Sequence, residues 1–478
     1  MRTVGVFDFG STAIKGSLIA EDSTVIYSIS KEHETIYKGK FIEQDAAVQY
    51  ETFKDITKTF ISNLKGNQLA GMIFIGQMQD IICLNEEGIP LANMILYSDT
   101  RAVSESEEIK REFGEDRLIK SFGNNLDASI PFAKLRWIKN NESYYNNINK
   151  ILFSPKDYII YKLTGEYVCD LTNGSTTGFI DIYKKDYNDE LIKFYNIDKS
   201  ILPRLYKTSQ IAGYSKAING IEETEGIPIY AGIGDAGATA FASGITNTGE
   251  VNINLGTTGW TSKISKTPSQ DGNVFNLIDY SGGMYINVVP FFNAGNVHKW
   301  VKNTFTSNNS YEEIDEILNK RIPGSNEVLF MPYLVGERFP VVDDKIRGAY
   351  YGITPNTGKI DLVSSALEGV GYSLRQGIEM IEKDMSKVTI IGGGGRVIEW
   401  NKIIADILAH PVEVYDDSEF IAGIALASLV FLDLNIINDI KDFVSKVSKV
   451  RHVEPNMDNN YDELYKRYIQ LYPKLKGI

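Results

Sequence analysis

The chain opens on a series of short runs rich in β-branched and aromatic residues. Only a few small or polar residues separate these runs, which are Val4–Phe9, Ile14–Ala20 and Val25–Ser30. This spacing predicts three strands joined by tight turns, an antiparallel start to a sheet. Between Tyr50 and Leu64 the apolar positions recur with helical spacing, and two more strand-like runs follow, Met72–Gly76 and Ile81–Leu84. The alternation of strand and helix periods predicts an α/β fold.

The same pattern returns in the second half of the chain. The strand-like run Val251–Leu255 ends in a turn of small residues, 256–259, and a further run, Trp260–Ile264, follows it. Later, Val388–Ile391 leads through four glycines into a helical stretch, Glu399–Leu408. We interpret this recurrence as two related α/β halves. The division is placed between residues 245 and 246, which gives the domains 1–245 and 246–478.

Length, composition and charge narrow the class of protein. The chain has 478 residues, 43% of them hydrophobic, which is too long for one ordinary core and typical of a soluble protein. Its net charge of −13 argues against general affinity for nucleic acid or an anionic membrane. The longest apolar run, Phe420–Leu432, is too short to span a bilayer. We therefore expect no nucleic-acid partner and no membrane partner.

The cysteines and histidines indicate neither a disulfide framework nor a metal site built from them. Cys83 and Cys169 lie in apolar, strand-like surroundings, which predicts buried thiols. The chain begins directly with a strand, without the apolar segment of a signal peptide. The four histidines show no metal-binding spacing. These features predict a protein of the reducing cytoplasm.

A glycine pattern in the middle of the chain matches the dinucleotide-binding fingerprint, Gly-x-Gly-x-x-Gly. The glycines are Gly232, Gly234 and Gly237, and Asp235 lies between them. A carboxylate inside a phosphate cradle would repel the ligand, and the candidate ribose-binding acid, Glu250, precedes the next strand instead of following it. The sequence therefore argues against a nicotinamide enzyme, which is kept as a rival interpretation.

Asp235 offers a different chemistry. A carboxylate at a strand-to-helix turn can accept the proton of a substrate hydroxyl group, and phosphoryl transfer uses one carboxylate to orient the attacking oxygen. The same residue type also caps helices, and Asp235 directly precedes the helical stretch Ala236–Ser243. Spacing alone does not choose between a catalytic base and a helix cap.

The two strand–turn–strand repeats carry candidate phosphate ligands. Their backbone N–H and hydroxyl groups could face one polyphosphate from both sides; the residues are Gly10, Ser11 and Thr12 in the first turn and Gly256, Thr257 and Thr258 in the second. Asp8, at the tip of the first strand, is placed to hold Mg²⁺ through water. The alternative is that such turns only close hairpins, with Asp8 as a turn cap. The chain contains no Gly-x-x-x-x-Gly-Lys-Ser/Thr motif, which excludes a P-loop.

At this level of detail the chain resembles the FGGY carbohydrate kinases, a family of the superfamily that also contains actin and the Hsp70 ATPases. Asp8–Lys15 is similar to the family's first phosphate motif, with Ser11 where threonine is commoner. Ser129–Asn140 fits one family signature, and Gly348–Ile353 followed by Asp361–Glu368 fits the other. The matches occur in the expected order over nearly the whole chain.

The resemblance implies a fold, cofactors and site residues. It implies two actin-like, ribonuclease H-like domains with a central cleft, in which the N-terminal domain binds the sugar and the C-terminal domain the nucleotide. Asp235 would be the catalytic base, and ATP and Mg²⁺ the cofactors, with the metal at Asp8. The implied nucleotide-binding residues are Gly10, Ser11, Thr12, Lys15, Gly256, Thr257, Gly295, Lys299, Gly393, Gly394 and Gly395. Met331–Tyr333 and Gly336–Arg338 resemble a further family segment, to which we assign a structural role.

On the sugar side the chain is most similar to xylulokinases. The implied substrate-binding residues are Gln77, Met78, Gln79, Asp99 and Asp235. Gln79 stands where xylulokinases have histidine, and Ala236 where they usually have asparagine. Because a side chain that pairs with one hydroxyl pattern rejects another, gluconate, ribulose, glycerol or another polyol stays open beside a ketopentose such as xylulose. For Asp99, a local salt bridge to Arg101 is the alternative interpretation.

The predicted function is an ATP-dependent kinase that transfers the γ-phosphate of ATP to a hydroxyl group of a small sugar or polyol. The rivals are an actin- or Hsp70-like ATPase without a sugar substrate, the nicotinamide oxidoreductase, and a non-catalytic sugar sensor on the same fold. Sugar-stimulated ADP release separates the kinase from the ATPase. The sequence leaves the oligomeric state open, with a homodimer as one expectation.

Overall fold

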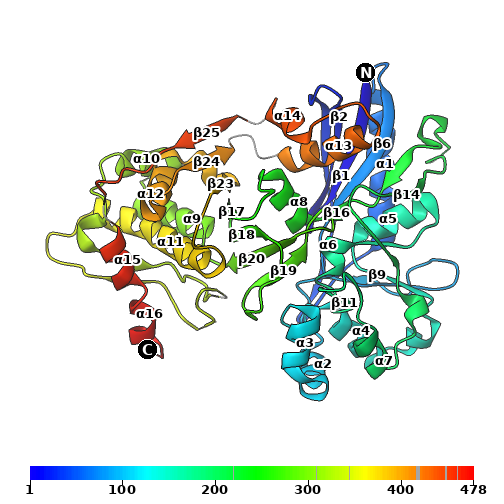
Figure 1. Cartoon of the computed structure of the whole chain (residues 1–478), viewed down its shortest axis with the longest axis horizontal. Helices are drawn as coiled ribbons and strands as arrows, with labels where there is room; N and C mark the ends of the chain where they lie inside the picture. Colours follow the sequence, from blue (N-terminus) through cyan, green and yellow to red (C-terminus); the bar gives the residue numbers. More distant parts are fainter. Residues whose placement is uncertain are drawn as a thin grey trace.

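The chain folds into two lobes, each built around a seven-stranded sheet (Figure 1). The computed structural model describes residues 1–478 with the exception of 219, 308, 338, 344, 416–419, 447, 448, 460 and 478. In Figure 1 the N-terminus lies at the top of the first lobe, on the right, and the C-terminus at the bottom of the second, on the left.

The first sheet has the strand order β14-β15-β6-β1-β2-β3, and β16 also pairs with β6. β1 runs antiparallel to β2 and parallel to β6, and β2 runs antiparallel to β3, which confirms the predicted opening of the chain. The strands are β1 (Arg2–Phe9), β2 (Ala13–Ala20), β3 (Val25–Glu32), β6 (Gln68–Gly76), β14 (Ile211–Tyr214), β15 (Pro228–Tyr230) and β16 (Ile233–Gly234).

The second sheet repeats this pairing in the order β19-β20-β18-β17-β23-β24-β25. β17 runs antiparallel to β18 and parallel to β23, and β18 runs antiparallel to β20. The recurrence found in the sequence is therefore a recurrence of sheet topology. The strands are β17 (Glu250–Leu255), β18 (Gly259–Ser265), β19 (Phe275–Ile278), β20 (Tyr285–Phe291), β23 (Lys387–Ile391), β24 (Val412–Tyr415) and β25 (Val450–Val453).

Shorter strands form small sheets beside the two large ones. They are β4 (Ile36–Lys38), β5 (Phe41–Gln44) and β8 (Met94–Ile95) in one, and the pairs β7 (Ile82–Leu84) with β9 (Lys150–Leu152), β10 (Val168–Asp170) with β13 (Arg204–Tyr206), β11 (Ile180–Asp181) with β12 (Asp186–Tyr187), and β21 (Leu329–Met331) with β22 (Ala349–Tyr351).

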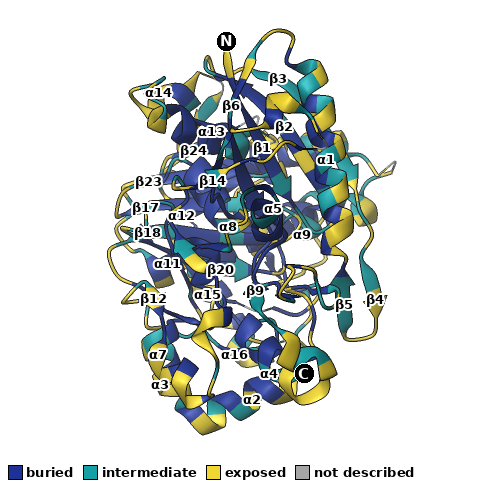
Figure 2. Cartoon of the chain, turned by 90° about the vertical axis from the view of Figure 1, so that its right-hand side faces the viewer, coloured by how far each residue is buried: buried dark blue, intermediate teal, exposed yellow. Residues whose placement is uncertain are grey.

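Helices cover the faces of both sheets (Figures 1 and 2). In the first half they are α1 (Ala46–Asn63), α2 (Val103–Ile109), α3 (Glu115–Phe122), α4 (Pro131–Asn141), α5 (Pro155–Thr164), α6 (Leu171–Gly174), α7 (Asp189–Phe194) and α8 (Asp235–Ala242). In the second half they are α9 (Gly295–Phe305), α10 (Tyr311–Leu318), α11 (Lys359–Ile381), α12 (Ile398–Leu408), α13 (Ile421–Asp433), α14 (Ile440–Ser445), α15 (Asp462–Tyr468) and α16 (Leu471–Leu475).

The helix predicted from Tyr50 begins earlier, at Ala46, because Asp45 caps it. The Asp45 carboxylate accepts hydrogen bonds from the backbone N–H groups of Ala47 and Val48, at 2.8 and 3.3 Å, which satisfies donors that a helix start otherwise leaves without partners. The buried side of α1 packs on the first sheet, where the Phe53 ring lies 4.7 Å from that of Phe7.

One helix from the second half of the chain lies on the first sheet. Ile421 and Val430 of α13 share a buried apolar cluster with Val4 and Val6 of β1 and with Phe241 of α8. α13 and α8 therefore meet between the lobes. The proposed domain 246–478 thus includes a helix that packs on the other lobe (Figure 1).

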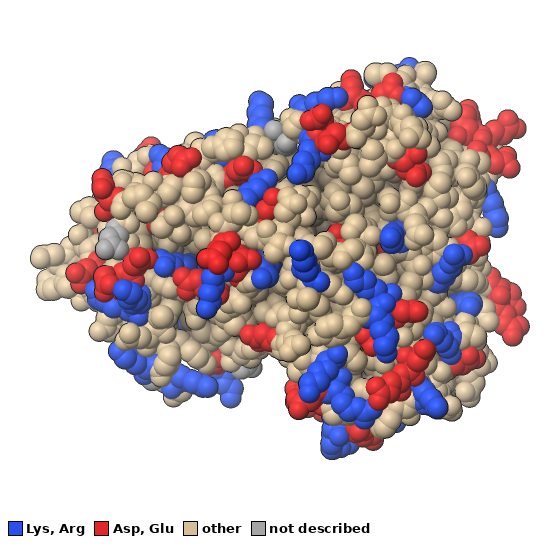
Figure 3. Space-filling model, viewed as in Figure 1, with Lys and Arg blue, Asp and Glu red and all other residues tan. Residues whose placement is uncertain are grey.

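Charged side chains of both signs lie on the surface, and the two cysteines lie in the interior, as their apolar surroundings predicted. Figure 3 shows basic and acidic side chains interspersed over both lobes on one face of the molecule. Cys83 and Cys169 are both buried free thiols. Among the helices that the structure describes, none combines the length and the apolar character needed to cross a membrane.

Candidate functional site

Three parallel strands of the first sheet end side by side. Phe9 of β1 and Gly234 of β16 both stand opposite Gly76 of β6. The segments that continue from these ends carry the first phosphate turn, the residues 77–80 and Asp235. Because ligands of open α/β sheets bind outside the carboxyl ends of parallel strands, the sheet order brings together residues 77–79, the predicted base and the first phosphate turn.

The second sheet gathers the predicted nucleotide residues in the same way. Asn254 of β17 stands opposite Ile391 of the parallel strand β23. The turn that begins at Gly256 and the glycines 392–395 follow directly after these two strand ends. The glycine loops therefore lie beside each other although more than a quarter of the chain separates them.

A cavity of about 300 Å³ lies between the lobes at these strand ends. Residues from the first half form one wall and residues from β18, β19 and β20 form the other. The lining residues are Met78, Gln79, Tyr97, Thr176, Asp235, Ala236, Trp260, Phe275, Leu277, Val288 and Pro290. Of the lining residues that the structure describes, none is a lysine or an arginine.

Asp235 is the first residue of α8, and its side chain is exposed toward this cavity. Gly234 occupies the cap position, and the Asp235 carboxylate accepts a hydrogen bond from the backbone N–H of Ala236 at 2.8 Å. Desolvation by the surrounding protein is the first cause that raises the pKa of the Asp235 carboxyl group, to about 7. The negative charge of Asp8 is the second cause. A carboxyl group with a pKa near neutrality is suited to accept a proton at physiological pH.

Asp8 lies on β1 opposite Lys15 of β2. Both residues line a second cavity of about 190 Å³, next to Ala422 and Gly423 at the start of α13. Burial raises the pKa of Asp8, while the neighbouring Lys15 acts to lower it. Since the Asp8 carboxylate also raises the pKa of Asp235, the predicted metal residue and the predicted base lie close enough to influence each other.

The predicted sugar residues 77–79 divide into two groups. Met78 and Gln79 line the cavity, whereas Gln77 is absent from its lining and donates a hydrogen bond to Gln44 at 3.3 Å. Gln79 has a φ of +63°, in the left-handed region, and its backbone N–H donates to Oδ1 of Asn173 at 3.2 Å. This unusual backbone conformation, held from a distant segment, directs the loop toward the cavity.

Asp99 is buried and engaged by protein donors. Its Oδ1 accepts from the backbone N–H and Nε of Arg101, and its Oδ2 accepts from Nη2 of Arg101 at 2.7 Å and from the backbone N–H of Ile42 at 2.6 Å. The salt bridge considered as the alternative is therefore present. Asp99 does not line the described cavity, so direct contact with a sugar stays a prediction that this geometry does not support.

The first phosphate turn is held by its own backbone and by neighbours. The N–H of Gly10 donates to the carbonyl of Ala13 at 3.1 Å, which closes the hairpin. The carbonyl of Ser11 accepts from Nε2 of Gln44 at 2.7 Å. Thr12 and Lys15 are exposed. Of the predicted phosphate ligands in this turn, Gly10 has its N–H already engaged.

The second phosphate turn packs against the start of α9. The N–H of Gly295 donates to the carbonyl of Gly256 at 2.9 Å, and a Cβ atom at Gly295 would lie 2.4 Å from that carbonyl oxygen. Only glycine permits this approach. Thr257, which follows Gly256, and Lys299, in the second turn of α9, are both exposed.

Glu337, in the segment that resembles the further family motif, holds the chain just before α9. The buried Glu337 accepts hydrogen bonds from the backbone N–H of Phe292 at 2.7 Å and from Nδ2 of Asn293 at 2.9 Å. Both donors directly precede α9, so the assigned structural role fits the geometry. Arg338 lies outside the described residues.

Packing does not account for all three of the predicted nucleotide-binding glycines 393–395. A Cβ at Gly394 would lie 2.7 Å from Cβ of Leu255, and one at Gly395 would lie 3.2 Å from Val414. Gly393 is exposed, and a Cβ there would meet no atom within 4 Å. Because neither packing nor a positive φ requires glycine at 393, close approach of a ligand is a sufficient reason for it.

The Gly-x-Gly-x-x-Gly pattern has a packing explanation. Gly232 has a φ of +70°, and a Cβ there would lie 2.0 Å from the carbonyl oxygen of Phe74. Cβ atoms at Gly234 and Gly237 would each lie 2.6 Å from a side chain, Met78 and Thr172 respectively. The three glycines therefore let β16 and α8 approach their neighbours, and they provide no evidence for a dinucleotide.

Several residues of the site were missed from the sequence. Tyr97, Thr176, Trp260 and Phe275 line the cavity but belong to no motif considered above. Trp260 directly follows the second phosphate turn, and Tyr97 lies two residues before Asp99, so these positions were the available signals. Thr176 and Phe275 lie far from any motif considered above.

Comparison with known proteins finds one family over most of the chain. Residues 3–242 match the N-terminal domain of the FGGY family of carbohydrate kinases, and residues 251–430 match the C-terminal domain of that family. The chain is 28% identical to the xylulose kinase of Staphylococcus xylosus over 97% of its own length and 98% of that protein.

Two solved structures share the fold over nearly the whole chain. The ligand-bound xylulose kinase from Lactobacillus acidophilus superposes with a TM-score of 0.91 at 22% identity, covering 100% of this chain and 99% of the other. The gluconate kinase from the same organism superposes with a TM-score of 0.90 at 22% identity, covering 99% and 98%. The expected architecture of two actin-like domains is thereby confirmed.

Proposed function

The chain belongs to the FGGY family of carbohydrate kinases, and we propose that it transfers the γ-phosphate of ATP to a hydroxyl group of a neutral sugar or polyol, with a ketopentose such as xylulose as first candidate. One observation carries this proposal. Asp235, with a pKa raised to about 7, is exposed to a cavity that both lobes line, at the strand ends that also carry the phosphate turns. The similarity to a xylulose kinase supports the candidate sugar.

Asp235 orients the attacking hydroxyl group and accepts its proton. The exposed parts of the two phosphate turns, around Thr12 and Thr257, hold the polyphosphate of ATP from opposite lobes. No protein atom packs against the position of a Cβ at Gly393, and the absence of that Cβ lets the nucleotide approach the backbone closely. In phosphoryl transfer such positioning and charge neutralisation supply most of the rate enhancement. The remaining requirement is a divalent cation.

The donor set at Asp8 fits Mg²⁺ rather than a metal held by protein alone. Within the described residues, no group of three or more His, Cys, Asp or Glu side chains could hold a metal ion. Mg²⁺ keeps several waters and commonly uses one or two carboxylates together with substrate phosphates, which is what one carboxylate beside a phosphate turn provides. When bound, Mg²⁺ would neutralise charge on the phosphate groups.

The cavity favours a neutral substrate over a sugar acid. A carboxylate-bearing substrate such as gluconate would meet the Asp235 carboxylate without a basic partner among the described lining residues. Like charges in a partly desolvated site are costly. The gluconate kinase of similar fold keeps gluconate as the second candidate.

A substrate panel tests this preference. We expect kcat/KM for neutral ketopentoses or polyols to exceed that for hexonates by at least about 10-fold, which corresponds to roughly 1.4 kcal/mol of charge repulsion. The measurement is coupled ADP release with pentuloses, hexonates, polyols and tetroses at equal concentrations. Gluconate as the best substrate would contradict the neutral-substrate proposal, and absence of any sugar stimulation would contradict the kinase.

The raised pKa of Asp235 predicts an acid limit to activity. Only the ionised carboxylate accepts a proton, so kcat/KM for the sugar should rise with pH through about 7 and level off above it. The residual activity of Asp235→Asn should lack this limb. If the variant keeps the same limb, the titrating group is the nucleotide or another residue.

A further inference from the structure

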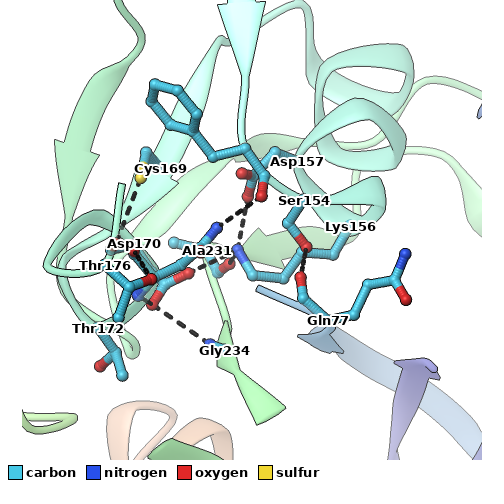
Figure 4. A network of polar contacts seen from close by, with 12 residues as sticks. Gln77, Ser154, Lys156, Asp157, Cys169, Asp170, Thr172, Thr176, Ala231 and Gly234 are labelled. Carbon is cyan, nitrogen blue, oxygen red and sulfur yellow. Dashed lines mark hydrogen bonds and ion pairs between the residues drawn. The ribbon is translucent and has the colours of Figure 1, made fainter. Parts of the chain in front are cut away.

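We propose that the buried cluster Lys156–Asp157–Asp170 is a positioning unit, which holds the backbone on the N-terminal side of Asp235 and thereby fixes the direction of the catalytic carboxylate. This inference rests on the proposed role of Asp235 as the base. The three side chains are fully buried, and none of them lines the cavity. Figure 4 shows how they lie around the Lys156 ammonium group.

Lys156 joins three acceptors. Its Nζ lies 2.5 Å from Oδ1 of Asp157, 2.9 Å from Oδ2 of Asp170 and 3.2 Å from the carbonyl oxygen of Ala231. The contacts with Asp157 and Ala231 are hydrogen bonds, and the contact with Asp170 is an ion pair. The carbonyl of Ala231 begins the short segment that leads through β16 to Asp235.

Asp170 holds the other end of that segment. Its Oδ1 accepts from the backbone N–H of Asn173 at 2.9 Å and from the backbone N–H of Gly234 at 3.3 Å. Gly234 is the cap residue of α8, directly before Asp235. The cluster thus contacts residues 231 and 234, the two ends of the segment that leads to the catalytic carboxylate (Figure 4).

The chain segments around Lys156 and Asp170 also hold the loop of residues 77–79, the sugar-facing loop. Oγ of Ser154, two residues before Lys156, donates to the carbonyl of Gln77 at 2.8 Å. Oδ1 of Asn173 accepts from the backbone N–H of Gln79 at 3.2 Å. Movement of the cluster would therefore shift the base and the sugar-facing loop together.

Stability alone is a weak reason for such a cluster. Replacing a buried ion-pair network by apolar residues of similar volume is often neutral or stabilising, whereas sub-ångström positioning of a catalytic group has a large effect on rate. A strand of two residues, Ile233–Gly234, has few ladder hydrogen bonds of its own to fix the residue that follows. Polar contacts from behind supply that constraint.

The cluster also contributes to the electrostatics around Asp235. With the ammonium group of Lys156 and the carboxylates of Asp157 and Asp170 ionised, the cluster carries a net negative charge. Burial is the first cause that raises the pKa of Asp157, to about 6. Two carboxylates raise the pKa of Asp235, namely Asp8 on β1 and Asp170 before α6. Asp235 in turn raises the pKa of two groups, Asp80 after β6 and Tyr97 in the cavity wall. Asp170 is a smaller cause of the raised pKa of Asp235 than desolvation by the surrounding protein and the charge of Asp8.

Two substitutions at Asp170 test the proposal. Asp170→Ala removes the acceptor for Gly234 and should lower kcat about 10²-fold. Asp170→Asn keeps an oxygen acceptor and should restore kcat to within about 10-fold of the wild type. Both remove a negative charge, so the acid limb of kcat/KM should move to lower pH in each. KM for ATP should stay unchanged, because the cluster contacts neither predicted nucleotide turn.

Asp406→Asn is the matched control, because Asp406 is also buried and accepts from the backbone N–H of Asn456 at 2.7 Å in the other lobe. It should alter stability but leave kcat and the acid limb unchanged.

Unaltered kcat and pH profile in both Asp170 variants would overturn the inference. If Asp170→Ala does not fold, the pH profile of Asp170→Asn decides. Asp235→Asn is measured in parallel: high activity in it refutes the base, whereas an inactive Asp235→Asn with wild-type Asp170 variants refutes only the positioning unit.

Discussion

Replacing Asp235 by asparagine is expected to lower kcat about 10²–10⁴-fold while nucleotide binding stays within a few-fold of the wild type. Asparagine has nearly the same shape and keeps an oxygen to accept the N–H of Ala236, but it cannot take a proton from the sugar hydroxyl group. The contacts predicted to hold ATP lie on the phosphate turns and on the second lobe, so they are unaffected. The measurements are sugar-dependent ADP release and titration with nucleotide.

The control for this substitution is Asp116→Asn, which changes an exposed carboxylate in the first turn of α3. It should keep wild-type kcat and the wild-type melting temperature. Near-wild-type turnover by Asp235→Asn would remove Asp235 from the mechanism. Loss of both turnover and nucleotide binding would instead indicate a folding defect.

Replacing Gly232 by alanine is expected to destabilise the first lobe by roughly 2–5 kcal/mol, the sum of left-handed backbone strain and overpacking. Gly232 has a φ of +70°, and the added Cβ would lie 2.0 Å from the carbonyl oxygen of Phe74. Phe74 is in β6, the strand that β1, β15 and β16 all pair with. The backbone therefore cannot move aside without disturbing the sheet that carries Asp235.

Gly226→Ala separates the two causes. Gly226 has a φ of +72°, but a Cβ there would meet no atom within 4 Å. It should cost only the strain of the backbone conformation, about 1–2 kcal/mol. The measurement is the denaturation midpoint of each variant. Equal losses for both would show that packing against Phe74 contributes nothing, and the packing explanation of the glycine pattern would then be wrong.

The local structure could be predicted from the sequence with few errors. The runs that became β1, β2, β3, β17 and β18 alternate or concentrate apolar residues according to the face they bury, and that signal needs no distant partner. The helix start at Asp45 was missed because capping by a side chain extends α1 beyond its apolar stripe. The repeat of strand, small-residue turn and strand indicated two related halves because each half must form the same antiparallel hairpin beside a parallel strand.

The candidate site could be predicted only where a motif marks it. The aspartate inside the glycine pattern argued against a dinucleotide, but that argument left Asp235 open as a catalytic base or a helix cap. The family resemblance then assigned Asp235 as the base. Asp99 matched a family pattern equally well, yet its carboxylate is engaged by Arg101 and by the N–H of Ile42. A pattern records which residue is present and not which partner engages it.

The sequence by itself determined the strands and helices that open each half, the recurrence of the two halves and the family resemblance, because periodicity, turn chemistry and short motifs are local properties of a chain. The tertiary structure alone decided which strand ends meet, that Trp260 and Phe275 of the second half complete a cavity around Asp235, and that Lys156 and Asp170 support it from behind. These contacts join residues far apart in the chain. They depend on sheet order and strand register, which no single stretch of sequence encodes.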